Sequence, residues 1–120
     1  MPEDQGTAIS ADGSVRYALR VPVELTIFRS HFPAMPIVPG VELVRWAVVF
    51  GRRQFKMPER FAGVEKLRFR RPVSPGLQLS LELRYLSSLA TLHFSFRSTD
   101  EPKSRVMADG RILFTDATGA

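Results

Sequence analysis

Apolar and polar residues alternate along five stretches of the chain, which predicts five β-strands. The alternation is cleanest over residues 79–85, where a serine, a glutamate and an arginine separate the apolar side chains. The same period of two begins at Val15, Leu67, Leu92 and Val106. Strands that are buried on one face and solvated on the other have this pattern. We therefore expect antiparallel strands with one polar face.

The pattern changes between the first and the second of these stretches. From about Pro39 or Gly40 to about Phe55, almost every side of a helix would be apolar, which is typical of a helix buried in a core. Proline is favourable at the first position of a helix. We therefore predict one long buried helix here.

The polar residues of this predicted helix form one stripe. At about 100° per residue, Glu42, Arg45, Arg52 and Arg53 fall within one sector. One interpretation is a solvated edge on which Glu42 and Arg45 are paired three positions apart. The other is the wall of a catalytic pocket.

The order of the segments indicates a single α+β domain. One antiparallel sheet around one apolar helix satisfies a strand, a buried helix and then several strands. We predict a flexible N-terminal tail over residues 1–14, the domain over 15–115 and a C-terminal tail over 116–120. A length of 120 residues with 44% hydrophobic and 24% charged residues agrees with one globular domain.

Composition excludes several classes of site. The chain has no cysteine, so disulfides, thiol nucleophiles and cysteine-ligated metals are excluded. No apolar run is long enough to span a membrane. The N-terminus is acidic and polar, unlike a signal peptide, so we expect a cytoplasmic protein.

The net charge is +5, from 17 Lys and Arg against 12 Asp and Glu. A solvated basic surface, nucleic acid and an acidic protein partner are all compatible with that charge. No motif that combines aromatic and basic residues for nucleic-acid binding is present. An acidic protein partner is therefore favoured over nucleic acid.

The loop before the predicted helix contains a candidate catalytic residue, a histidine. His31 is followed by Pro33, Pro36 and Pro39, and proline stiffens the backbone by fixing φ. The loop would carry the histidine to a helix N-terminus. There the amides of residues 40 and 41 lack intrahelical acceptors, and the helix dipole favours negative charge.

This loop and the helix after it resemble the 3-hydroxyacyl-acyl-carrier-protein dehydratases of the FabA/FabZ type. The likeness rests on His31–Gly40, which reads His-Phe-Pro, then Pro-apolar-apolar-Pro-Gly. The pair Trp46-Ala47 and the segment Gly63–Gly76 make it more specific, to the ApeI-like dehydratases of aryl-polyene and related pigment pathways. The resemblance covers residues 15–114. It implies a hotdog fold, an antiparallel sheet wrapped around one long buried helix.

The resemblance also implies a reaction, removal of water from a 3-hydroxyacyl thioester to give a trans-2-enoyl thioester. His31 occupies the catalytic histidine position of the family, and an imidazole that titrates near neutral pH suits a base. The amide of Gly40 would stabilise negative charge on the thioester oxygen. Residues expected to contact substrate, or else to belong to the core, are Phe32, Pro39, Val41, Trp46 and Phe69.

Partners follow from the same resemblance. The family needs no metal and no bound cofactor, because its substrate is carried on the phosphopantetheine of an acidic acyl-carrier protein. Hotdog domains usually pair side by side, which also covers edge strands. We expect a homodimer, with a heterodimer with another hotdog subunit as the alternative, and no association with nucleic acid or membrane.

The chain departs from the family at one catalytic position. The second catalytic residue is usually Asp or Glu, fourteen positions after the histidine, and here it is Arg45. Arginine stays protonated and has no acceptor, so it cannot act as a carboxylic acid. Ala34 also replaces the glycine that follows Pro33 in the family.

Three explanations for Arg45 are open. Glu42, one turn upstream, supplies the acid; or His31 acts alone while Arg45 holds a water or the leaving oxygen; or the site is inactive and the chain is the partner half of a heterodimer. Two further functions compete with a dehydratase. They are a hotdog thioesterase, which would release free thiol, and a non-catalytic acyl-binding subunit.

The remaining charged residues carry weaker evidence for a function. His93, the second histidine, lies on the polar face of a predicted strand, and direct catalysis by it is not favoured. Most basic residues near the predicted site are expected to be solvated, and some of them to dock the acidic carrier protein or its phosphate. The candidates are Arg52, Arg53 and Lys56 at the helix end, and Lys66, Arg68, Arg70 and Arg71 on the next strand.

Overall fold

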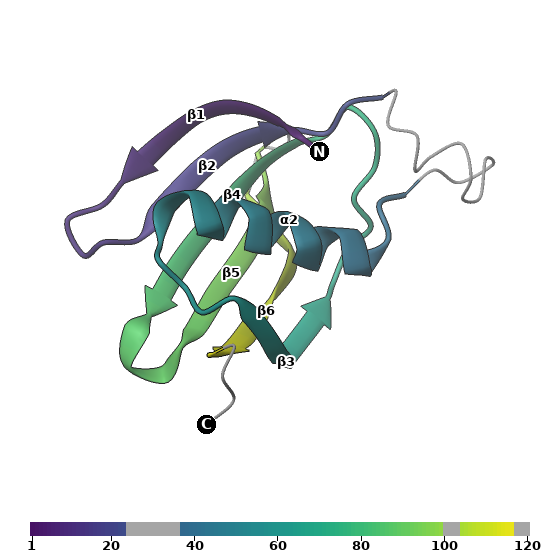
Figure 1. Ribbon diagram of the computed structural model, residues 1–120. Helices are drawn as coiled ribbons and strands as arrows, with labels where there is room; N and C mark the ends of the chain where they lie inside the picture. The colour runs from purple at the N-terminus through teal and green to yellow at the C-terminus, as the bar shows by residue number, and fades with distance from the viewer. Residues whose placement is uncertain (24–36, 100–103, 117–120) are drawn as a thin grey trace.

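The computed structural model of the chain describes residues 1–23, 37–99 and 104–116, which form a sheet layer and a helix layer. Six strands make one antiparallel sheet in the order β1-β2-β4-β5-β6-β3, and the helix α2 crosses one face of it (Figure 1). The α+β class with an antiparallel sheet and one helix is confirmed for the described residues. The elements are β1 (Glu3–Ile9), β2 (Val15–Arg20), α2 (Gly40–Gln54), β3 (Arg60–Phe69), β4 (Gln78–Leu86), the 3-10 turn η1 (Ser87–Leu89), β5 (Thr91–Ser98) and β6 (Arg105–Thr115).

The alternating stretches form strands, as predicted. In β2 the side chains of Val15, Tyr17 and Leu19 are buried, and the residues between them are exposed or half-buried. β4 and β5 continue the same layer, with Leu81 directly opposite Phe96. The apolar residues of every second position thus meet in one core on the helix side of the sheet.

The predicted flexible tail over residues 1–14 contains a strand. Residues Glu3–Ile9 form β1, which pairs with β2 from Glu3↔Arg20 to Ile9↔Val15. A turn follows, in which the Asp12 carboxylate accepts from the Ser14 amide at 3.0 Å. Every side chain of β1 is exposed, so the strand is held by its backbone ladder and leaves no apolar alternation in the sequence.

The predicted helix is confirmed, but it is not buried on almost every side. It contacts the sheet along one face, where the Phe50 ring lies 4.6 Å from the Tyr17 ring. The Gln54 amide donates to the Tyr17 hydroxyl at 2.7 Å. Val41 is 74% exposed, because the sheet of one chain covers only one side of the helix. The buried residues are Leu43, Trp46, Ala47, Phe50 and Gly51.

β3 is longer than predicted and lies at the edge of the sheet. It begins at Arg60 rather than near Lys66, and pairs with β6 on one side only among the described strands. Its pairing with β6 is interrupted between Glu65 and Arg68, where Lys66 has a positive φ of 50°. None of its side chains is fully buried. Alternation was weak here because this edge strand is mostly exposed, and among its large apolar residues only Leu67 packs partly against the core. In the described part of the chain, no helix is long and apolar enough to cross a membrane.

Candidate functional site

Among the described residues, no side chain caps the start of α2. Pro39 precedes the first turn, and its carbonyl accepts hydrogen bonds from the amides of Glu42 (3.0 Å) and Leu43 (3.3 Å). Within the described residues, the amides of Gly40 and Val41 have no hydrogen-bond acceptor. The helix dipole adds partial positive charge at the same point. Two backbone donors are therefore available there for an anionic oxygen.

A hollow of about 310 Å³ lies beside this helix start. The amide of Val38 donates to the carbonyl of Val73 at 2.7 Å, which joins the segment before α2 to the segment after β3. Both residues lie in segments that carry the resemblance, but no sequence pattern pointed to the bond between them, because it depends on tertiary placement. The lining residues are Ile37, Val38, Pro39, Gly40, Leu43, Phe69, Arg70, Arg71, Pro72 and Val73.

The ring of Phe69 lies directly against Gly40. A Cβ atom built on residue 40 would lie only 2.5 Å from the Cζ atom of Phe69. The side chain of Phe69 is 52% exposed, so its ring covers the helix start without being locked in the core. The structure thus brings together the predicted residues Pro39, Gly40 and Phe69, and glycine is what allows the ring its close approach.

Two arginines stand at the rim of this apolar hollow. The amides of Arg70 and Arg71 both donate to the Met107 carbonyl, at 2.8 and 3.1 Å. Their side chains also line an adjoining hollow of about 470 Å³ together with Arg105, which the sequence analysis did not single out. Arg70 lies 3.8 Å from the Asp109 carboxylate. A cationic rim beside an apolar wall suits a ligand with an anionic group and an aliphatic tail.

In the polar stripe of α2, Glu42 and Arg45 form the ion pair that was one of the two interpretations of this stripe. The Arg45 guanidinium donates to the Glu42 carboxylate at 3.2 Å, and the two side chains are 63% and 24% exposed. Neither residue lines the hollow beside Gly40. The carboxylate is thus already engaged by the arginine that replaces the family's acid.

The remaining predicted site residues do not gather at this point. His31 and Phe32 lie outside the described residues. Trp46 is 1% exposed and belongs to the core. Val41 faces away from the core on the first turn, where it is accessible to a ligand or a second chain.

The basic residues at the helix end have structural partners. Arg52 donates to the carbonyls of Pro58 and Glu59, both at 3.1 Å. The Arg53 guanidinium lies 4.6 Å from the centre of the Phe50 ring. The two bonds of Arg52 hold the end of α2 against the segment that leads into β3, whereas the contact of Arg53 lies within the helix.

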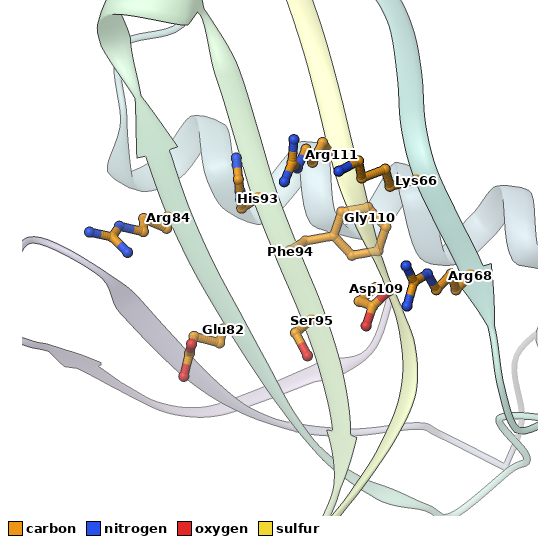
Figure 2. Close-up of a pocket in the computed structure, with 10 residues that line it drawn as sticks. All are labelled: Lys66, Arg68, Glu82, Arg84, His93, Phe94, Ser95, Asp109, Gly110 and Arg111. Carbon is orange, nitrogen blue, oxygen red and sulfur yellow. The ribbon is translucent and has the colours of Figure 1, made fainter.

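Lys66 and Arg68 line a different hollow from Arg70 and Arg71, although all four residues are close in sequence. Both line a polar hollow on the face of the sheet opposite α2, together with His93 (Figure 2). Burial lowers the pKa of His93, and the nearby charges of Arg111 and Arg84 lower it further. Among the described residues no group of three metal-ligating side chains occurs, and His93 is not adjacent to the helix start.

The chain matches one family model and superposes on several solved structures. The family described as ApeI-like, ApeI dehydratase, matches residues 7–111. An uncharacterized protein from Erwinia carotovora subsp. atroseptica superposes with a TM-score of 0.89 at 24% identity, covering 98% of each chain. The dehydratase heterocomplex ApeI:P from Xenorhabdus doucetiae gives 0.83 at 23% identity, covering 94% of this chain and 96% of that one.

A larger dehydratase shares the same fold. The dehydratase domain of the polyketide PpsC from Mycobacterium tuberculosis gives a TM-score of 0.74 at 13% identity. The match covers 94% of this chain but only 44% of that one. At these identities the superpositions show the fold alone, and it agrees with the hotdog architecture that the loop motif predicted.

Proposed function

The chain belongs to the ApeI-like dehydratase family, and from that premise we propose that it removes water from a 3-hydroxyacyl thioester to give a trans-2-enoyl thioester. The observation that carries the proposal is the apolar hollow at the uncapped start of α2. Backbone donors, an aliphatic wall and a cationic rim meet there. These are the features that a thioester with an acyl chain and a phosphate-bearing arm requires.

In the proposed reaction a base takes a proton from C2, and the thioester oxygen gains negative charge. The C2–C3 double bond then forms as hydroxide leaves C3 and takes the proton that the base accepted from C2, so that one water is released. We assign the base to His31 on the sequence resemblance, since this residue lies outside the described part of the chain. The amide of Gly40 is assigned to the oxygen, because a donor already oriented by a helix needs no rearrangement as the charge develops.

The acyl chain and its carrier occupy the rest of the site in this proposal. Pro39 and Phe69 contact the first acyl carbons, and Val41 lies on the exposed side of the same turn. Arg71 at the rim receives the phosphate of the phosphopantetheine arm, with the acidic carrier protein docked outside it. Arg71→Gln should therefore raise KM for carrier-bound substrate more than it lowers kcat, and an unchanged KM would contradict this docking.

Protonation of the leaving hydroxide is the step that Arg45 alters. Because Glu42 is paired with Arg45 at 3.2 Å, we do not assign it the role of the acid. We assign Arg45 the holding of a water or of the leaving oxygen. Turnover by the chain alone should then be slow compared with an enzyme that has a carboxylic acid at this position.

A mass-spectrometric assay of a 3-hydroxyacyl thioester on carrier protein tests this proposal. The wild-type chain should remove one water per acyl group slowly, and His31→Ala should abolish the loss. Arg45→Glu should accelerate it by about a hundredfold, the lower end of the range for general acid catalysis. Arg45→Gln is the matched control, because it frees Glu42 without adding a carboxylate. Unchanged turnover in His31→Ala would refute the assignment of the base.

A second candidate function, a partner subunit in a hotdog heterodimer, is favoured by the edge of the sheet. On β3 the side chains of Phe61 and Phe69 are 58% and 52% exposed, and one side of the strand is unpaired among the described strands. An exposed apolar edge strand is a ready template for pairing with a second chain. The ApeI:P structure is itself a heterocomplex, so a second hotdog chain, identical or different, is the proposed occupant.

Light scattering after size-exclusion chromatography separates the two candidates. A homodimer with measurable dehydration supports the enzyme. A chain without dehydration that forms a stable complex with a hotdog protein carrying Asp or Glu at the Arg45 position supports the partner subunit. A chain that stays monomeric at micromolar concentration and binds no such protein would contradict the proposal that a second hotdog chain, identical or different, covers β3.

A further inference from the structure

A separate hollow lies on the outer face of the sheet, opposite α2. Figure 2 shows it from outside, with the helix behind the strands. Its volume is about 400 Å³, within the range of small-ligand sites. The lining residues are Lys66, Arg68, Glu82, Arg84, His93, Phe94, Ser95, Asp109, Gly110 and Arg111.

Register places three of its basic residues in one row. His93 on β5 is directly opposite Arg84 on β4 and Arg111 on β6. Neighbouring strands lie about 4.8 Å apart, so the two arginines flank the imidazole at roughly 10 Å from each other. The irregularity in β3 brings Lys66, with its positive φ, and Arg68 to the same hollow.

The carboxylates of this hollow already have partners. Glu82 is paired with Arg16 at 3.1 Å, and Asp109 lies 3.8 Å from Arg70. Glu65 is opposite Arg111 in the ladder but does not line the hollow.

Four cations are left without such a partner. Within the described residues, Lys66, Arg68, Arg84 and Arg111 form no ion pair with a carboxylate. The outer face therefore carries a local excess of positive charge.

That excess has a cost in the folded protein and an observable consequence. Like charges on neighbouring strands repel and destabilise a sheet. Beyond the effect of burial, the charges of Arg111 and Arg84 lower the pKa of His93, as expected at a point of positive potential. An anion seated among these side chains would relieve both effects.

We propose that this outer-face hollow binds a small phosphate-bearing anion. Guanidinium groups match phosphate oxygens with two parallel hydrogen bonds, and three arginines line this hollow together with a lysine and an imidazole. None of the large apolar residues that are exposed on the described surface lines the hollow, which favours a small ligand over a protein interface. The proposal is independent of the site at the start of α2, because the two lie on opposite faces of the sheet.

Titration with pyrophosphate in low-salt buffer, followed by calorimetry and by NMR of the histidine ring signals, tests the inference. Binding should raise the pKa of His93, since an anion favours the protonated ring. Arg84→Gln and Arg111→Gln should each weaken binding by about tenfold or more, as loss of a charge-assisted hydrogen bond predicts. Added salt should weaken binding in the wild type.

Arg97→Gln is the matched control. Arg97 lies on β5, is exposed and does not line the hollow, so its loss removes the same charge from the chain and should change Kd by less than about twofold. Equal weakening in this variant would overturn the proposal, because net charge alone would then explain binding. Absence of pyrophosphate binding, or binding that leaves the His93 signals unchanged, would overturn it as well.

Two further probes separate the sources of the phosphate. Inorganic phosphate and a nucleoside diphosphate are titrated under the same conditions. If pyrophosphate and the nucleotide bind with equal affinity, and Arg111→Gln weakens both, the site recognises the phosphate groups alone. Tighter binding of the nucleotide assigns it to a larger phosphate ester, and either result supports the proposal.

Discussion

Replacing Gly40 with alanine tests how the ring of Phe69 closes the start of α2. The added Cβ would lie 2.5 Å from Cζ of Phe69 and 2.8 Å from Cε1 and Cε2, well inside the roughly 3.5–4.0 Å at which carbon atoms pack. Gly40 is not among the positive-φ glycines of the described chain, so its backbone accepts alanine. The ring, which is the end of a half-exposed side chain, must therefore move.

The expected cost follows from what the ring buries. A phenylalanine buries roughly 150–250 Å² when fully enclosed, and Phe69 is 52% exposed, so about 100 Å² is at stake. At about 25 cal/mol per Å², complete displacement costs up to ~2.5 kcal/mol. Alanine regains up to ~1 kcal/mol over glycine in a helix. We expect Gly40→Ala to lower the free energy of unfolding by about 1 kcal/mol, within the range for overpacking.

Urea unfolding of four proteins measures this effect: wild type, Gly40→Ala, Phe69→Ala and the double variant. Without the ring, Gly40→Ala should be neutral or stabilising by up to ~1 kcal/mol. The coupling between the two substitutions should therefore reach about 1–2 kcal/mol. If Gly40→Ala has the same effect in both backgrounds, to within about 0.5 kcal/mol, the two residues are independent and the reasoning is refuted.

Three other perturbations test the packing, the charges and the edge of the sheet. Gly51→Ala should destabilise by about 1–3 kcal/mol, because its Cβ would lie 2.8 Å from Leu92, which is 0% exposed; an unchanged urea midpoint would contradict this. Burial and arginine charges lower the pKa of His93 from 6.5, so the unfolded chain binds the proton more readily and stability should fall as the pH drops below about 6.5. His93→Gln should flatten that part of the Tm-versus-pH curve, and an identical curve would exclude His93 as its cause. Phe61→Lys, on the exposed edge of β3, should lower the mass measured by light scattering if β3 pairs with a second chain, and an unaltered dimer would place the interface elsewhere.

Much of the fold could be predicted because burial leaves a local record. The strand at Val15–Arg20 and the helix at Gly40–Gln54 were both identified from residues that lie within a few positions of each other. β1 escaped prediction for the same reason, since its side chains are all exposed, and it is held by the backbone ladder and by an ion pair between Glu3 and Arg20 rather than by apolar burial. The burial of the helix was overestimated, because its composition does not reveal how much of it one sheet covers.

The candidate site was predictable in part. The motif before the helix pointed to Gly40 and Pro39, and both line the hollow beside the helix start, while their roles stay predictions. The ion pair between Glu42 and Arg45 was one of two interpretations, and spacing alone could not choose between them because both require the same helix face. The role of His31 stays a prediction, as this residue lies outside the described part of the chain.

By itself, the sequence determined the element types, the start of α2 and the family, because these depend on periodicity and on a contiguous motif. Only the tertiary structure decided which basic residues act together. Lys66 and Arg68 join His93 on the outer face, whereas Arg70 and Arg71 stand beside the hollow at Gly40. The division depends on the irregular pairing of β3 with β6 and on where β3 ends. Such register is set by contacts between residues far apart in the chain, and no local pattern records it.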